Sequence, residues 1–167
     1  MIEQRPSLNF REKYVVVLMF IIAACFLLLQ IVSFISSRAK AVVVEEDTIR
    51  MSTNEMLSFV RVAITIILGL TGALLLRKIR AAGWVISMAV LLLFTLILAA
   101  ILYGIFMTFQ QLDWMMGIGL LGVMILLTGV VFLFVPATRK KFRAGRNSIL
   151  AALLLFILLS GMFFFLQ

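Results

Sequence analysis

Five apolar runs, each long enough to cross a membrane as a helix, constrain this chain more than any other feature. A spanning helix needs about 20 predominantly apolar residues. Each run is bounded by charged residues, proline or glycine. Because a backbone in lipid must satisfy its own hydrogen bonds, the runs predict an all-α integral membrane protein. We expect one domain over residues 1–167, a bundle of five transmembrane helices at Tyr14 to Ser36, Met56 to Leu76, Gly83 to Phe109, Trp114 to Pro136 and Ser148 to Leu166.

The composition limits the catalytic, metal-binding and disulfide chemistry that is open to this chain. Hydrophobic residues make up 65% of the chain, against about 45–50% in soluble domains. Histidine is absent, which removes the commonest general base and the commonest ligand for zinc, copper or haem. Cys25 is the only cysteine, so we expect no disulfide within the chain and a thiol that packs as a small hydrophobe.

The first apolar run imitates a secretory signal, because a basic leader precedes it and Ala39-Lys40-Ala41 follows it. Its 23 residues exceed the roughly 7 to 15 of a signal sequence's apolar region. We therefore predict a retained signal anchor.

The segment 37–55 separates the first two spans. Ser52 and Glu55 fit a capping box, which predicts that the second helix starts near Thr53. Residues Ala41 to Val44 are compatible with a short strand or an interfacial stretch. The consecutive acids Glu45, Glu46 and Asp47 do not converge on one point, so we expect a solvated loop and no metal site.

The loop charges predict an orientation, since Lys and Arg near spanning segments stay in the cytoplasm. With the amino terminus inside, eleven of these cations lie in inner segments and three in outer loops. The pattern favours a cytoplasmic amino terminus and a carboxyl terminus outside. Short loops and the lack of an organelle-targeting leader favour a bacterial inner membrane over an organellar one.

Two inner loops carry most of the positive charge. Topology alone explains these cations, and contact with anionic lipid headgroups is the alternative. A single aromatic, Phe142, and a short loop argue against nucleic acid as a partner. The residues are Arg77, Lys78, Arg80, Arg139, Lys140, Lys141, Arg143 and Arg146.

The same loops suggest an internal repeat, because residues 70–83 resemble residues 127–145. Both stretches contain Leu-Thr-Gly followed by a basic turn. A true duplication would make the second and third spans a hairpin that recurs as the fourth and fifth. Chance similarity in so restricted an alphabet is the alternative.

Small residues at helical spacing mark faces where membrane helices approach closely. One face lies on the second span and the other on the fourth. We expect both to be buried, either by packing within the bundle or by docking of a partner subunit. Their members are Thr65, Gly69, Gly72, Gly119, Gly122 and Gly129.

Arg61 is the only charged residue within an apolar run. It lies near the outer end of its span, where it can snorkel or pair with an acid, and Asp113 and then Glu55 are the candidate partners. A headgroup or anionic substrate in a groove beside it is the functional alternative. We expect Gln30 to form an interhelical hydrogen bond, and the Trp84, Trp114, Tyr14 and Tyr103 rings to anchor span ends at the membrane surface.

No phosphate loop, Cys/His cluster or nucleophile motif occurs, and we expect no cofactor, no metal and no catalytic residue. The chain is expected to be a non-catalytic polytopic membrane protein, a supporting or assembly subunit that contacts lipids and other membrane subunits. The alternative is a small transporter or lipid-handling protein that uses Arg61 and a glycine-lined groove. An enzyme built on the outer acids is the third reading.

Overall fold

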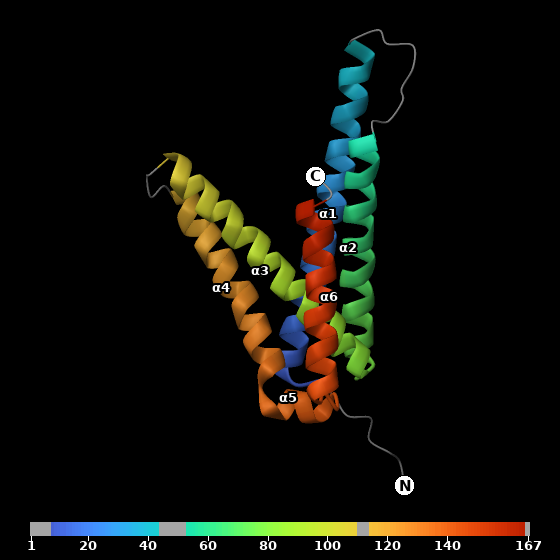
Figure 1. Ribbon diagram of the computed structural model, residues 1–167, viewed down its shortest axis with the longest axis vertical. Helices are drawn as coiled ribbons and strands as arrows, with labels where there is room; N and C mark the ends of the chain where they lie inside the picture. Colours follow the sequence, from blue (N-terminus) through green and yellow to red (C-terminus); the bar gives the residue numbers. More distant parts are fainter. Residues whose placement is uncertain (1–7, 44–52, 110–113, 166–167) are drawn as a thin grey trace.

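The computed structural model describes residues 8–43, 53–109 and 114–165, and all regular structure in these ranges is helical. Five helices are long and apolar enough to span a membrane, which confirms the predicted all-helical fold with five long apolar helices. A sixth, short helix, α5, was not predicted. The helices are α1 Phe10–Val43, α2 Thr53–Arg77, α3 Ala81–Phe109, α4 Trp114–Phe134, α5 Pro136–Lys141 and α6 Arg146–Phe165 (Figure 1).

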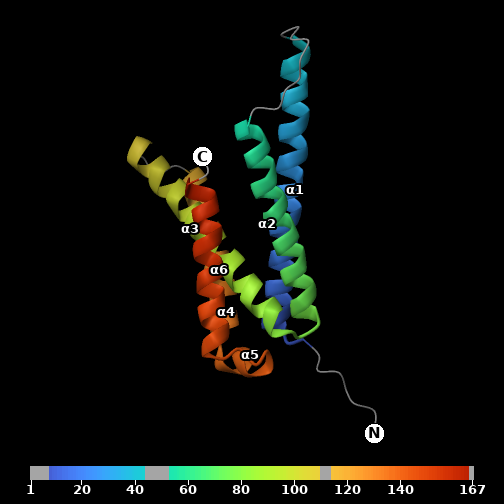
Figure 2. The ribbon, with the colours of Figure 1, turned by 45° about the vertical axis from the view of Figure 1, so that its right-hand side comes forward.

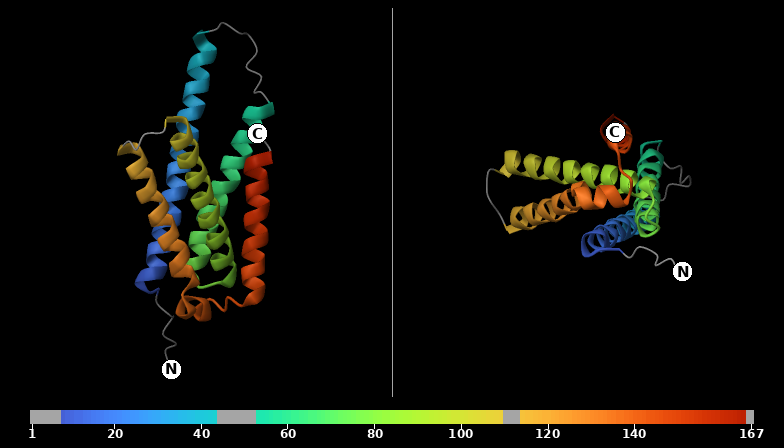
Figure 3. Two further views of the ribbon diagram at one scale, coloured as in Figure 1. Left: turned by 60° about the vertical axis from the view of Figure 1, so that its left-hand side comes forward. Right: turned by 90° about the horizontal axis from the view of Figure 1, so that it is seen from below.

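The boundaries of the first two spans differ in part from the sequence prediction. Helix α1 begins at Phe10 and continues to Val43, so residues 41–43 are helical and neither a strand nor an irregular interfacial stretch. The left view of Figure 3 shows α1 extending beyond the other helices. Helix α2 begins at Thr53, as predicted. Ser52, Glu45, Glu46 and Asp47 lie outside the described residues.

Two helices end in the same backbone motif. After α2, the N–H of Arg80 donates to the Leu75 carbonyl at 3.1 Å and that of Ile79 to the Leu76 carbonyl at 2.9 Å. This is a Schellman motif, whose penultimate residue adopts a left-handed conformation, and Ile79 has a φ of 53°. After α5 the same pair of bonds places Arg143 at that position, with a φ of 51°.

A proline creates α5. Val135 precedes Pro136 and has an extended ψ of 132°, as expected for a residue before proline. Helix α4 therefore ends at Phe134, and the chain turns to run across the end of the bundle as α5 before α6 begins (Figure 1).

Packing is dense at one end of the bundle and sparse at the other. Helix α3 packs against α2, α4 and α6, and α1 packs against α2 and α4. The most buried apolar side chains lie in the first half of α3 and opposite it: Val15, Met19, Leu76, Trp84, Leu91 and Leu133. Towards the other end the α3–α4 pair diverges from α1, α2 and α6 (Figures 1 and 3).

We call the densely packed end the basic end. It comprises the start of α1, the α2–α3 turn, α5 and the start of α6. We call the opposite part the open half, in which residues 27–36 of α1, 56–60 of α2, 99–108 of α3 and 117–125 of α4 are mostly exposed. The start of α1 and the end of α6 lie at opposite ends of the molecule (Figure 2).

Candidate functional site

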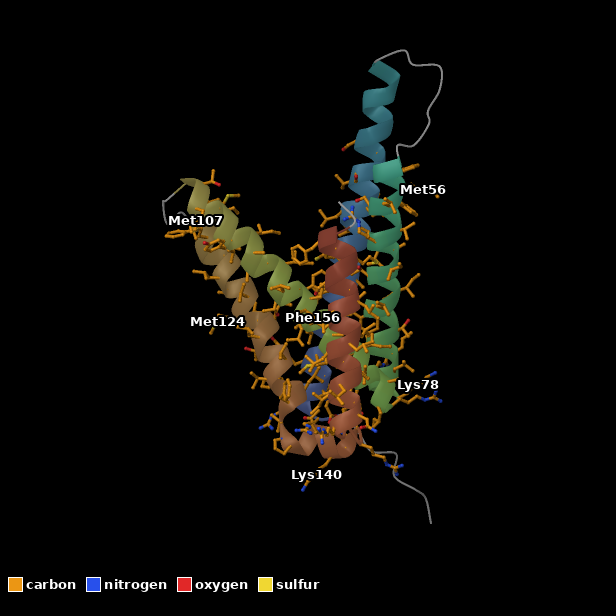
Figure 4. The ribbon with its side chains drawn as sticks, viewed as in Figure 1. Met56, Lys78, Met107, Met124, Lys140 and Phe156 are labelled. Carbon is orange, nitrogen blue, oxygen red and sulfur yellow. The ribbon has the colours of Figure 1, made fainter. Side chains whose placement is uncertain are left out.

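Positive charge is concentrated at the basic end. Every described Lys and Arg side chain except that of Arg61 belongs to the elements that meet there. Lys78 and Lys140 project outward from this end in Figure 4. The two loops singled out in the sequence, which hold Arg77 to Arg80 and Arg139 to Arg146, are therefore brought together.

A buried ion pair ties two of these elements to each other. The Glu12 residue is 2% exposed, and its Oε2 lies 2.6 Å from Nζ of Lys141 in α5. The same oxygen accepts the backbone N–H of Asn9 at 2.8 Å, so Glu12 also caps the start of α1. Nothing in the sequence pattern distinguished Glu12, and Lys141 was expected to be one of several loop cations that mark the topology.

Trp84 is not a membrane-surface anchor, and that expectation was wrong. Its side chain is fully buried, and its indole N–H donates to the Leu133 carbonyl at 2.9 Å. Leu133 lies in the last turn of α4, where carbonyls have no partner within the helix. Trp84, which lies in α3, therefore caps the C-terminal end of α4. Trp114 and Tyr103, in contrast, are largely exposed.

Tyr14 links the start of α1 to α4. Its hydroxyl donates to the Ile125 carbonyl at 3.0 Å, and its ring meets the Phe132 ring edge-on with centroids 5.4 Å apart. An edge-to-face pair of this kind contributes about 0.5–1.5 kcal/mol beyond area burial. Three side chains, Glu12, Tyr14 and Trp84, thus fasten α1, α3, α4 and α5 together by polar contacts.

The small residues of α2 face neighbouring helices of the same chain. A Cβ atom at Gly69 would lie 3.4 Å from that of Ala23 in α1, and one at Gly72 would lie 3.0 Å from Ser87 Oγ in α3. Thr65 is buried, and its hydroxyl donates to the Arg61 carbonyl at 2.9 Å.

The glycines of α4 are placed in the same way. A Cβ atom at Gly119 would overlap Leu102, and one at Gly122 would lie 3.1 Å from Leu98, both in α3. At Gly129 it would lie 3.0 Å from Leu18 in α1. A partner would have to displace the chain's own helices to reach either small-residue face, so we place no docking surface there.

Arg61 is partly buried on α2 and forms no ion pair with any side chain that the structure describes. Of its candidate partners, Asp113 lies outside the described residues, and so does the Glu55 side chain. The described part of the chain therefore does not test whether Arg61 pairs with Asp113 or Glu55.

An apolar groove of about 520 Å³ lies between α1 and α2 in the open half. Arg61 is two positions from both Phe59 and Ala63 of its wall, so at about 100° per residue it leaves α2 from roughly the opposite face. The predicted glycine-lined groove beside Arg61 is thus not the groove observed. The wall consists of Leu27, Gln30, Ile31, Phe34, Phe59, Ala63, Ile66 and Ile67.

Two single-residue expectations have different outcomes. Gln30 lies at this groove, and its side chain shows no hydrogen bond to the described residues, so the predicted interhelical bond is not seen. Cys25 is exposed on α1 rather than packed as a small hydrophobe. Among the described residues no three His, Cys, Asp or Glu side chains are grouped as metal ligands.

The repeat hypothesis does not describe the packing. Helices α2 and α3 lie side by side as a hairpin, whereas α6 packs on α3 rather than forming the equivalent hairpin with α4. The turns also differ in register, because Arg143 occupies the left-handed position of its motif while its sequence counterpart, Arg80, follows that position.

Comparison with known proteins gives no further guidance. No family model, no curated protein and no solved structure matches the chain.

Proposed function

We propose that the protein is a non-catalytic supporting or assembly subunit of a larger membrane complex. The observation that carries the proposal is the contrast in packing along the bundle. The basic end is closed by the chain's own contacts, while the open half leaves faces of four helices uncovered.

The exposed side chains of the open half suit a protein partner. Phe34 of α1, Phe106 and Met107 of α3 and Met124 of α4 are all exposed there. Aromatic residues and Met are enriched at protein interfaces. Lipid offers little hydrophobic drive for helix association, so a partner would be held by close packing against these side chains.

The test is gentle extraction of the protein from its own membrane at natural expression, followed by native mass measurement and identification of the components. We expect a stoichiometric set of other membrane proteins. Recovery of the chain alone, or only with copies of itself, would overturn the proposal. Phe106→Ala and Met107→Ala together should reduce partner recovery, while Leu150→Ala, an equally exposed apolar change near the basic end, serves as the control.

The proposed topology places the basic end in the cytoplasm and the carboxyl terminus outside, in a bacterial inner membrane. Its support is the gathering of the loop cations at one end of the bundle, since such residues are retained in the cytoplasm. A reporter fused after Gln167 should be active on the outer face. A cytoplasmic signal would contradict this orientation.

The groove between α1 and α2 supports a second candidate, a small transporter or lipid-handling protein. Its volume lies within the roughly 300–1,000 Å³ of ligand pockets, and its wall suits an acyl chain. Ala63→Phe would fill the groove and should abolish co-purification of lipid, whereas Ala99→Phe, on an exposed position of α3, should not. Equal lipid content in both variants would remove this candidate.

A further inference from the structure

Helix α5 is held in a fixed position at the basic end. Thr138 and Phe142 are buried, whereas Lys140 and Arg143 are exposed, so one side of the segment packs and the other faces outward. The ion pair between Lys141 and Glu12 adds a polar attachment to α1. The cations of this segment are therefore positioned by the fold.

Negative charge is scarce around these cations. Glu12 is the only acidic residue whose side chain the structure describes, and it already binds Lys141 and the Asn9 N–H. Arg139, Lys140, Arg143 and Arg146 have no carboxylate partner among the described side chains. An external anion would reduce the mutual repulsion of this group.

One atom distinguishes Arg139 from its neighbours. Its Nε is buried and has no hydrogen-bond partner among the described residues, although the residue as a whole is partly exposed. A buried N–H donor without a partner is costly, and native structures rarely leave one. The guanidinium presents Nε together with its terminal nitrogens as a planar fork that matches two oxygens of a phosphate.

We infer that Arg139 binds a phosphate group at the basic end. The group is carried either by an anionic membrane lipid or by a soluble anion. Because the Nε atom is buried, the phosphate reaches it only when the Arg139 side chain turns outward. One phosphate oxygen then accepts the Nε–H and another accepts a terminal N–H, while Lys140 and Arg143 contribute positive charge. Arg139 thus provides the directed hydrogen bonds, and its neighbours provide a positive electrostatic potential. This inference is independent of whether the chain is a subunit.

The substitution that tests the geometry is Arg139→Lys, because lysine keeps the charge and lacks the fork. Native mass spectrometry in neutral detergent would count bound phosphatidylglycerol during a titration. We expect Arg139→Lys to weaken binding about tenfold, the scale of one lost charge-assisted bond. Arg143→Lys, in the same segment, should stay within about twofold. Equal affinities in both variants would show attraction by diffuse charge and overturn the inference.

Salt provides a test on the unaltered protein, which applies even where Arg139→Lys fails to fold. Near 1 M salt the screening length is about 3 Å, so selectivity from surface charge is lost while a two-point hydrogen bond to the guanidinium persists. Retained preference for phosphatidylglycerol over phosphatidylcholine at this salt concentration supports the site. Loss of the preference contradicts it.

The source of the phosphate is decided in phosphatidylcholine nanodiscs. If millimolar inorganic phosphate raises the unfolding midpoint of the wild type but not of Arg139→Lys, the ligand is a soluble anion. If only phosphatidylglycerol in the disc has this effect, the ligand is a lipid headgroup. If neither acts, the inference is wrong.

Discussion

The basic end and the open half share helices α1 to α4 but are stabilised in different ways. At the basic end, charged and aromatic side chains make specific contacts between helices, including Glu12 with Lys141 and Trp84 with Leu133. In the open half the described helices expose mostly apolar side chains, and α3 diverges from α1 and α2. This difference indicates that the contacts at the basic end fix how the helices are arranged.

Substitutions at the two ends of such a structure should differ in their cost to stability. Close contacts that involve backbone or buried polar atoms cannot relax, so substitutions at the basic end should be costly. Exposed positions of the open half have room for change within the isolated protein. The contrast can be measured as the free energy of unfolding of variants in mixed micelles.

The largest effect is expected from Glu12→Ala. It removes the carboxylate that binds Lys141 and accepts the Asn9 N–H, and loss of one partner of a buried pair costs about 3–5 kcal/mol. Because Lys141 keeps a 19% exposed side chain, we expect a loss of about 3 kcal/mol. Arg11→Ala, next to it and exposed, should change stability by less than about 0.5 kcal/mol.

Glu12→Leu combined with Lys141→Met provides the matched control. Replacing both members of a buried pair by apolar residues is often neutral, so the double variant should regain most of the lost stability. If Glu12→Ala alone has no measurable cost, the ion pair does not close the basic end.

Gly83→Ala should be next in size. A Cβ atom there would overlap the backbone N of Leu76 and the backbone carbon of Leu75. Backbone cannot rotate away as a side chain can, so we expect a loss of about 2–3 kcal/mol. Gly104→Ala in the open half has no atom within 4 Å of the new methyl and should be neutral or stabilise by up to about 1 kcal/mol. Similar costs at the two glycines would contradict the contrast.

Trp84→Phe should have an intermediate effect. It leaves the buried Leu133 carbonyl without its donor, which costs about 1–3 kcal/mol. The exposed Trp114 provides the comparison, and Trp114→Phe should leave the unfolding free energy unchanged within error. A larger effect at Trp114 would show that the ordering of the two ends is reversed.

The smallest effect is a gain in stability. Arg143 is exposed and held at a φ of 51°, a conformation that glycine adopts without the penalty of about 1–2 kcal/mol that other residues incur. After the entropy cost of glycine, Arg143→Gly should stabilise the protein by up to about 1 kcal/mol. Lys140→Gly, inside α5, should instead destabilise it by about 1 kcal/mol.

The sequence predicted those features that depend on local pattern. Hydropathy is summed over neighbouring residues, so five long apolar helices could be counted without knowing their contacts. The start of α2 at Thr53 followed from a capping pattern of four residues. The glycine faces were expected to be buried, and Gly69, Gly72 and Gly129 are, whereas Gly119 and Gly122 are half-buried. The choice between neighbouring helices and a partner required coordinates.

Features that join distant residues could not be predicted in this way. Glu12 and Lys141 are 129 positions apart, and in isolation each resembles an ordinary loop charge. The buried Trp84 was misjudged because a tryptophan near the end of a span usually anchors it at the membrane surface. Pro136 is visible in the sequence, but a proline specifies where a helix ends and not the direction that the chain then takes.

The most direct test of the proposed subunit role is site-specific photo-crosslinking in the native membrane. A photoreactive residue at Phe34 or Met107 samples the open half, and one at Leu150 samples an equally exposed position near the basic end. We predict discrete protein adducts from the first two positions and only lipid adducts from the third. Lipid adducts alone at all three positions would show that membrane lipid, rather than a partner protein, fills the open half.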